Sequence, residues 1–137
     1  MRGHSIFQKL MTHTLIIRKR ERDWQGNFKD VEVDQESDFH AFIQTEFGAL
    51  IEGKASILEE KGFVQYGRKL VTDLKGEEVL ASAIVFLPST SHINPFHEHW
   101  MIDQKAPLIR DDMEVIRIDP IDDPRTGKTH HYEVAVR

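Results

Sequence analysis

Short runs of residues that favour an extended backbone, separated by polar turns, constrain this chain more than any other feature. The first two runs, residues 12–22 and 28–33, flank the turn Asp23-Trp24-Gln25-Gly26-Asn27. Thr and Ile favour strands in the first run, and Gly26 and Asn27 tolerate a positive φ in the turn. The pattern predicts a β-hairpin over residues 12–33.

A second pair of runs follows in the middle of the chain. Residues 63–71 and 78–87 flank the turn Asp73-Leu74-Lys75-Gly76. The later run is apolar on both faces, which is typical of a strand in the centre of a sheet or between two layers. It is expected to end at Pro88.

The last pair of runs, residues 113–119 and 129–137, flanks a turn-rich stretch that contains Asp123-Pro124-Arg125-Thr126-Gly127. The final run alternates apolar and polar residues, as a half-buried antiparallel strand does. Residues 88–112 hold three of the five prolines and show little periodicity. We expect that stretch to be rich in loops, with a short strand at 99–102.

Two segments carry helical spacing. Residues 5–11 suit one or two turns of helix, because their apolar residues recur at intervals of three and four. Residues 37–60 are ambiguous: Ser37 or Asp38 could cap a helix, while Gly48 and Gly53 weaken it, and a long loop with one short helix is the alternative. The apolar stripe of that segment consists of Phe39, Phe42, Ile43, Phe47, Leu50 and Ile51.

These elements predict a mainly β fold, a small antiparallel β-barrel or sandwich with a short N-terminal helix and a long loop or helix insertion. The 137 residues suit a single domain over 1–137, with 37–61 as the possible insertion. The chain has no cysteine, so disulfides and thiolate metal sites are excluded.

Charge and hydropathy exclude several classes of function. Eighteen basic and 23 acidic residues give a net charge of -5, which argues against a general binder of phosphate backbones. The longest apolar runs fall far below the roughly 20 residues of a membrane helix, and the first residues do not resemble a secretion signal. The sequence has no P-loop, no Gly-x-Ser-x-Gly and no dinucleotide fingerprint.

His97 and His99 form the sharpest local cluster. On an extended backbone the two imidazoles project to the same side, as two metal ligands would. A third ligand would have to come from elsewhere, and the sequence offers His92, Asp103, His130 and His131. His-x-His alone is a weak motif, so we favour surface or interface histidines and expect no cofactor.

Two groups of charged residues are candidates for interaction. Arg18, Arg20 and Arg22 share one face of the first strand, where they could contact nucleic acid or an acidic protein surface, or protect a sheet edge. We favour the interface or edge role, because phosphate binders usually have a wider basic surface. The acidic group is Asp111, Asp112, Asp119, Asp122 and Asp123, which a metal-dependent nuclease could use but which turns also favour.

Three stretches resemble one known family. They are the opening strand with Asp23-Trp24-Gln25-Gly26, the strand pair with Gly76-Glu77-Glu78-Val79 and Val85-Phe86-Leu87, and the closing hairpin with His131-Tyr132-Glu133-Val134. Together they resemble small neck proteins of long-tailed bacteriophages, the minor capsid, head-closure or head–tail stopper proteins. The likeness covers about half of the chain and is poor over residues 37–61.

The resemblance implies a virion structural protein, not an enzyme, that assembles in the host cytoplasm and resides in the neck of the virion. Its subunits are expected to form a homo-oligomeric ring, twelve-fold in the family, between portal or adaptor proteins on one side and tail proteins on the other. The ring closes the DNA-filled head and docks the tail. DNA passes through it or is retained nearby without sequence-specific binding, and no membrane is involved.

On this reading the two charged groups become candidate subunit interfaces, because ring subunits meet head-to-tail and need complementary surfaces. The arginine face would meet the acidic group of the next subunit. Residues 37–61 would supply a channel-facing loop, with Phe42, Phe47, Gly48 and Gly53 as candidate residues.

Two alternatives stay open. A tail-completion or tail-terminator protein of the same neck would share these features. From another class, a small metal-dependent β-barrel enzyme would use His97 and His99.

Overall fold

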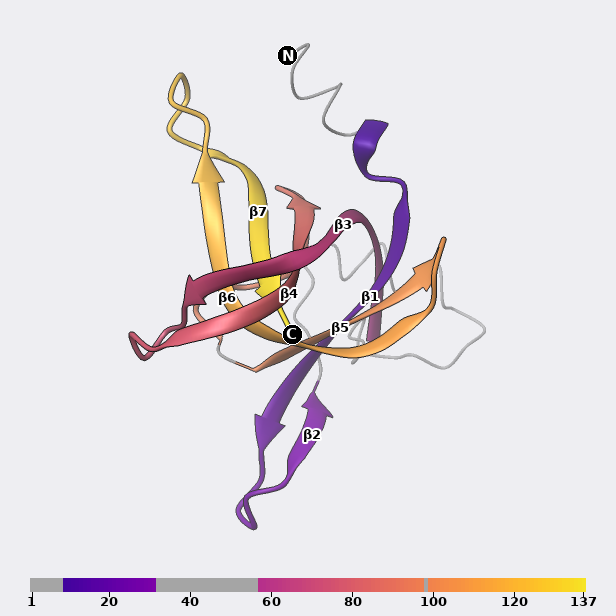
Figure 1. Ribbon diagram of the computed structural model, residues 1–137, viewed down its shortest axis with the longest axis vertical. Coiled ribbons are helices and arrows are strands. Elements are labelled where there is room, and N and C mark those ends of the chain that lie inside the picture. Colours follow the sequence, from indigo (N-terminus) through magenta and orange to yellow (C-terminus); the bar gives the residue numbers. More distant parts are fainter. Residues whose placement is uncertain (1–8, 32–56, 98) are drawn as a thin grey trace, which may run out of the picture.

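The described residues of the computed structural model, 9–31, 57–97 and 99–137, form one antiparallel sheet of seven strands in the order β2-β1-β3-β4-β7-β6-β5 (Figure 1). The strands are β1 (His13–Arg22), β2 (Phe28–Val31), β3 (Ile57–Thr72), β4 (Glu78–Pro88), β5 (Trp100–Ala106), β6 (Arg110–Asp122) and β7 (Thr129–Val136).

The order of strands returns to its beginning, because β1 also pairs with β5. One edge of β1 pairs with β3 over residues 13–18, and the other edge pairs with β5 over residues 14–19. Strand β2 pairs only with the last four residues of β1, from Lys19 to Arg22. The six strands β1 and β3 to β7 therefore each pair with two others of the six, and β1 pairs in addition with β2, so that the β1–β2 hairpin extends beyond them.

Strand β3 changes partner at Gly62. Its residues 57–62 pair with β1, and its residues from Phe63 onward pair with β4. A Cβ at Gly62 would lie 2.6 Å from Cδ1 of Leu15 and 2.7 Å from the carbonyl oxygen of Phe86. Only glycine allows β1, β3 and β4 to approach this closely, so this position fixes where β3 passes from one partner to the other.

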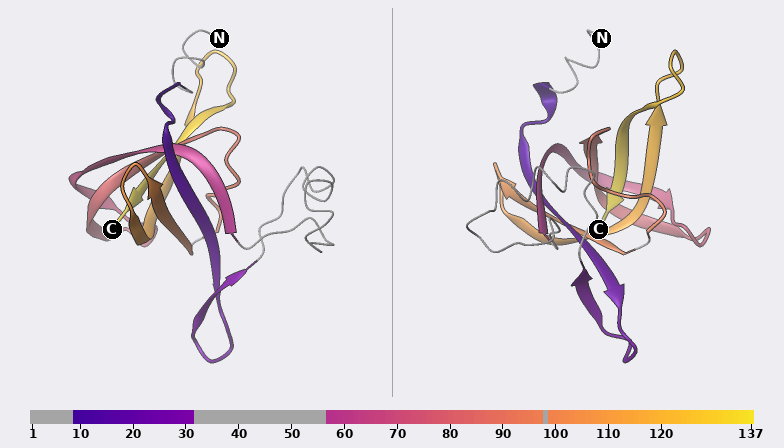
Figure 2. Two further views of the ribbon diagram at one scale, coloured as in Figure 1. Left: turned by 90° about the vertical axis from the view of Figure 1, so that its right-hand side faces the viewer. Right: turned by 180° about the vertical axis from the view of Figure 1, so that it is seen from behind.

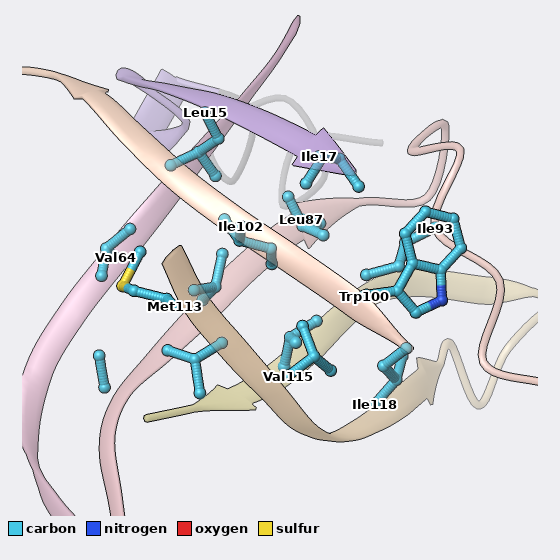
Figure 3. Packing of buried hydrophobic residues seen from close by; sticks show 14 of the residues in the cluster. Leu15, Ile17, Val64, Leu87, Ile93, Trp100, Ile102, Met113, Val115 and Ile118 are labelled. Atoms are coloured by element: carbon cyan, nitrogen blue, oxygen red, sulfur yellow. The ribbon is translucent and has the colours of Figure 1, made fainter. Parts of the chain in front are cut away.

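The core lies between the strands and draws side chains from β1 and from β3 to β7 (Figure 3). Burial of each large apolar side chain contributes roughly 1.5–3 kcal/mol. Trp100 is 1% exposed, and its Nε1–H donates to the carbonyl of Asn94 (3.1 Å), which satisfies its one polar atom. The largest fully buried apolar side chains are Trp100, Leu15, Ile17, Leu87, Ile102, Met113, Val85, Val134 and Val136.

Three hairpin turns lie at separate extremities of the molecule (Figures 1 and 2). In the β1–β2 turn, Oδ1 of Asp23 accepts hydrogen bonds from the backbone N–H groups of Gln25 and Asn27, both at 2.9 Å. Asp73 does the same for Lys75 and Glu77 in the β3–β4 turn. The same Asp-x-x-Gly chemistry thus closes two hairpins, with Gly26 and Gly76 at φ 87° and 85°.

The three expected hairpins are confirmed, and β4 lies between β3 and β7 as its apolar sequence predicted. The N-terminal helix is not seen: Lys9 and Leu10 are helical, but a bond from Thr12 N–H to Leu10 C=O (2.9 Å) turns the chain into β1. Residues 5–8 of that helix, and residues 37–56 of the expected insertion, lie outside the described residues. Of the expected insertion the structure describes only residues 57–61, which are strand and begin β3.

Residues 88–112 are more ordered than we expected. They contain all of β5 and the start of β6, because Asp103 and Gln104 are buried with tertiary partners that a sequence does not reveal. The alternation expected in β7 also ends early: Ala135 is buried in a second small cluster with Ala81 and Ile116. Within the described residues, no helix has the length and apolar character needed to cross a membrane.

We expect Gly62→Ala to lower the free energy of unfolding by about 1–3 kcal/mol, because the added methyl group overpacks the contact between Leu15 and the Phe86 backbone. Urea unfolding followed by circular dichroism measures the change. Lys69→Ala, an exposed substitution on the same strand, is the control and should leave the midpoint nearly unchanged. Equal midpoints for both variants would contradict the close approach at Gly62.

A second prediction concerns His13, which sits where β3 leaves β1. Its Nδ1 accepts a hydrogen bond from the N–H of Val64 (3.0 Å), and its ring stacks on Phe63. Burial lowers the pKa of His13 below 6.5. Below that pH the unfolded chain takes up the proton first, so this contribution to stability is complete above pH 6.5 and is lost as the pH falls through the lowered pKa.

His13→Asn should remove this part of the pH dependence, because an amide oxygen accepts the same bond without titrating. The measurement is the unfolding free energy of both proteins between pH 5 and pH 8. As the pH falls, the parent should lose unfolding free energy that the variant keeps, so the stability of the parent relative to the variant should decrease. Parallel curves would show that His13 does not titrate differently in the two states.

Candidate functional site

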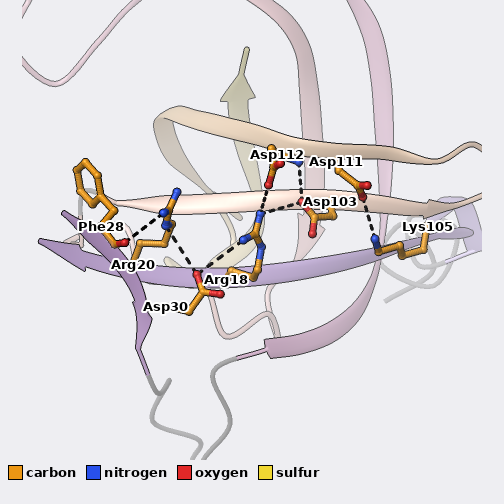
Figure 4. Close-up of polar contacts among 8 residues, drawn as sticks. All are labelled: Arg18, Arg20, Phe28, Asp30, Asp103, Lys105, Asp111 and Asp112. Carbon is orange, nitrogen blue, oxygen red and sulfur yellow. Dashed lines mark hydrogen bonds and ion pairs between the residues drawn. The ribbon is translucent and has the colours of Figure 1, made fainter.

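Arg18 is the centre of a charged cluster between β1, β2 and the β5–β6 hairpin (Figure 4). Its Nη2 donates to Oδ1 of Asp103 (3.1 Å) and to Oδ1 of Asp112, and its Nη1 lies 3.7 Å from Oδ1 of Asp30. The side chains of Arg18 and Asp103 are only 16% and 11% exposed. One arginine therefore joins four strands through three carboxylates.

Asp103 is the least exposed carboxylate of this cluster, which we name the Arg18 cluster (Arg18, Asp30, Asp103 and Asp112). Besides Arg18, it accepts the backbone N–H of Asp112 (2.7 Å), a residue at φ 59° near the start of β6. Partial burial acts to lower the pKa of Arg18, but the hydrogen bonds to Asp112 and Asp103 and the surrounding negative charges raise it above its usual value. The cation is thus held permanently charged among its partners.

Arg20 and Arg22 lie farther along β1, beside Phe28. The guanidinium carbon of Arg20 is 5.5 Å from the Phe28 ring centroid and that of Arg22 is 4.9 Å from it. Arg20 also lies 3.7 Å from Asp30. The expected arginine face is therefore present, but Arg18 is paired with carboxylates of its own chain.

The acidic candidates also have partners within their own chain. Asp111 pairs with Lys105 (2.8 Å), and this hydrogen bond raises the pKa of Lys105. Asp123 caps its turn by accepting the N–H of Arg125, which lowers the pKa of Asp123. The remaining pairs are Asp112 with Arg18, Asp119 with Arg117 (2.8 Å), and Asp122 with Thr129 (3.3 Å).

The fold therefore brings the arginine face and the acidic group together only in part. Asp112 meets Arg18, while Asp119, Asp122 and Asp123 lie along the β6–β7 hairpin, at the other end of the molecule from the β1–β2 turn (Figure 1). The contact that sequence reasoning placed between two subunits, arginine face against acidic group, exists at Arg18 and Asp112 within one subunit. Whether the other members meet a neighbour stays a prediction.

His97 and His99 lie beside each other, with ring centroids 6.0 Å apart and the rings nearly perpendicular. His97 Nε2 is 2.7 Å from the carbonyl oxygen of Arg20, and the ring contacts Trp100 edge-on. Within the described residues, no three side chains of the His, Cys, Asp or Glu type converge as a metal site. The candidate channel residues Phe42, Phe47, Gly48 and Gly53 lie outside the described residues.

Sequence reasoning missed an exposed apolar surface on the β3–β4 hairpin. Leu70 and Leu80 are direct cross-strand partners, 64% and 49% exposed, and Leu74 in the turn is 58% exposed. At the end of the neighbouring hairpin Trp24 is 90% exposed. The signal was present in the sequence, because Leu70 and Leu80 alternate with Val71 and Val79, which face the core, so the leucines fall on the other face of the hairpin.

Comparison of the chain with models of protein families, with curated proteins and with solved structures finds no match.

We expect Asp103→Ala to lower the free energy of unfolding by about 3 kcal/mol, because it leaves Arg18 and the N–H of Asp112 without their common acceptor. Thermal unfolding is the measurement. Asp111→Ala is the matched control, since its pair with Lys105 is solvent-exposed and should contribute little. A loss no larger than that of the control would show that the Arg18 cluster does not hold these strands together.

Proposed function

We propose that this chain is a structural subunit of a phage neck, a head-closure or stopper protein that works by assembling into a ring. The six mutually paired strands are inferred to form a small antiparallel β-barrel, the compact body such a subunit needs. The hairpins that extend from it provide the contacts to neighbouring proteins.

The observation that carries the proposal is the leucine surface of the β3–β4 hairpin, Leu70, Leu74 and Leu80. An exposed cross-strand pair of leucines has no role in the core of its own chain, because both side chains lie on the hairpin's outer part. Apolar side chains gathered on a projecting hairpin are typical of a surface that another protein covers. Trp24, on another hairpin, is of the kind that anchors an interface.

The charged residues support the same proposal. Arg18, Asp112, Asp111 and Asp119 have ion-pair partners within their own chain. Arg22 has no ion pair with a carboxylate among the described residues and stays available at one end for a partner. The neck role in particular rests on the resemblance of the three sequence stretches, and the net charge of -5 would let a ring pass DNA without holding it tightly.

The test is genetic. In the phage or prophage that encodes the chain, deletion should yield filled heads that do not join tails and that lose their DNA on purification. Electron microscopy and nuclease protection of the packaged DNA measure both effects, and a plasmid copy should restore infectious particles. Infectious, tailed particles without the chain would contradict the proposed function.

A finer test compares two adjacent residues on opposite faces of β3. We expect Leu70→Glu to lower the yield of tailed particles at least about tenfold, since a charge buried in an interface is costly. Lys69→Glu changes the net charge more but alters the other face, so its yield should stay near that of the parent. Equal yields would contradict assembly through the leucine surface.

A further inference from the structure

A hollow of about 330 Å³ lies where five parts of the chain meet, one of them residues 99–101 at the start of β5. The β1–β2 hairpin supplies Arg20, Arg22 and Phe28, the β3–β4 turn supplies Lys75, β6 supplies Glu114, and the C-terminal residue Arg137 closes one side; we name it the basic hollow. Four of its side chains are cationic and one is a carboxylate. The described residues hold 16 basic and 16 acidic side chains, so the hollow is a local excess of positive charge on a balanced surface.

Two of the cations are already matched. Arg137 binds Glu114 through Nε (2.8 Å) and Nη2 (2.6 Å), and the backbones of the two residues are also paired. Arg20 shares Asp30 with Arg18. Within the described residues, no ion pair joins Arg22 or Lys75 to a carboxylate, and both side chains are exposed. The basic hollow thus holds two positive charges that its own chain does not neutralise.

Phe28 determines how the arginines are presented. Both guanidinium groups lie against its ring, and His99 meets the same ring edge-on at 4.8 Å. Such cation–π contacts restrict the arginine side chains without using their N–H donors. The donors of Arg22 are therefore preorganised and open to an acceptor outside the chain.

We propose that the basic hollow binds the phosphodiester backbone of nucleic acid, without reading its bases. Guanidinium groups match phosphate oxygens in geometry and charge. An acidic protein segment would also bring apolar side chains, and the hollow offers them little room, since Trp100 is buried at its base and the arginines occupy the Phe28 ring. Within the hollow a base likewise finds no free aromatic face on which to stack, because the arginines occupy the Phe28 ring.

The contact is made at the face where the β1–β2 hairpin and the β3–β4 turn meet, because these two elements supply Arg22 and Lys75. The proposal stands on these residues alone and does not require the neck role.

The test is fluorescence anisotropy of the full chain with mixed-sequence DNA oligonucleotides, single- and double-stranded, from 25 to 200 mM salt. Binding at low salt should weaken steeply as salt rises, with equal affinity for unrelated sequences. The double variant Arg22→Glu/Lys75→Glu should bind DNA at least about tenfold more weakly. Its salt dependence should also be shallower, since each phosphate contact adds roughly 0.9 to the slope for duplex DNA.

The matched control is Arg125→Glu/Lys128→Glu in the β6–β7 turn, which changes the net charge equally at the opposite end of the molecule (Figure 1). It should lose no more than about twofold in affinity, and Arg22→Lys/Lys75→Arg should retain binding. Thermal unfolding verifies that every variant is folded. Equal losses in the two charge-reversed variants would overturn the proposal, as would absence of DNA binding by the parent chain or preference for polyglutamate over DNA.

Discussion

The close approach of three strands at Gly62 is the constraint on which the rest of the structure depends. There β3 leaves β1 and joins β4, and a single methyl group would collide with Leu15 and with the Phe86 backbone. Because β3 changes partner, β1 keeps its other edge for β5, and the strand order returns to its start. The core around Leu15 and Trp100 forms inside this arrangement.

Charge pairing then decides which residues are left for other molecules. Arg18 binds three carboxylates from three different strands, so the cluster is part of the scaffold that holds β1 against the β5–β6 hairpin. Two of the surfaces that the described residues leave open lie on hairpins: the leucines of β3–β4, and the pair Arg22 and Lys75 at the basic hollow. The scaffold thus uses the cation of Arg18, while the cations of Arg22 and Lys75 are left for contacts with other molecules.

The sequence predicted what is local and not what is distant. The turns at Asp23, Asp73 and Asp123 were recognisable because each depends on a side chain and a backbone within five residues. Strand β5 was largely missed, because the polar residues Asp103 and Gln104 suggested a loop. Both are buried in the fold, where Asp103 accepts a hydrogen bond from Arg18 and Gln104 one from Tyr66. The arginine face was predicted, but its partner Asp112 is 94 residues away, so only the fold shows that the contact is internal.

The central claim is that this chain works as an assembled neck subunit whose β3–β4 hairpin is covered by a neighbour. A cryo-electron microscopy reconstruction of a phage neck assembled in the presence of this chain tests this most directly. We predict density for the chain in a ring below the portal, with Leu70 and Leu80 against another protein. A neck without this chain, or a ring in which that hairpin faces solvent, would contradict the account.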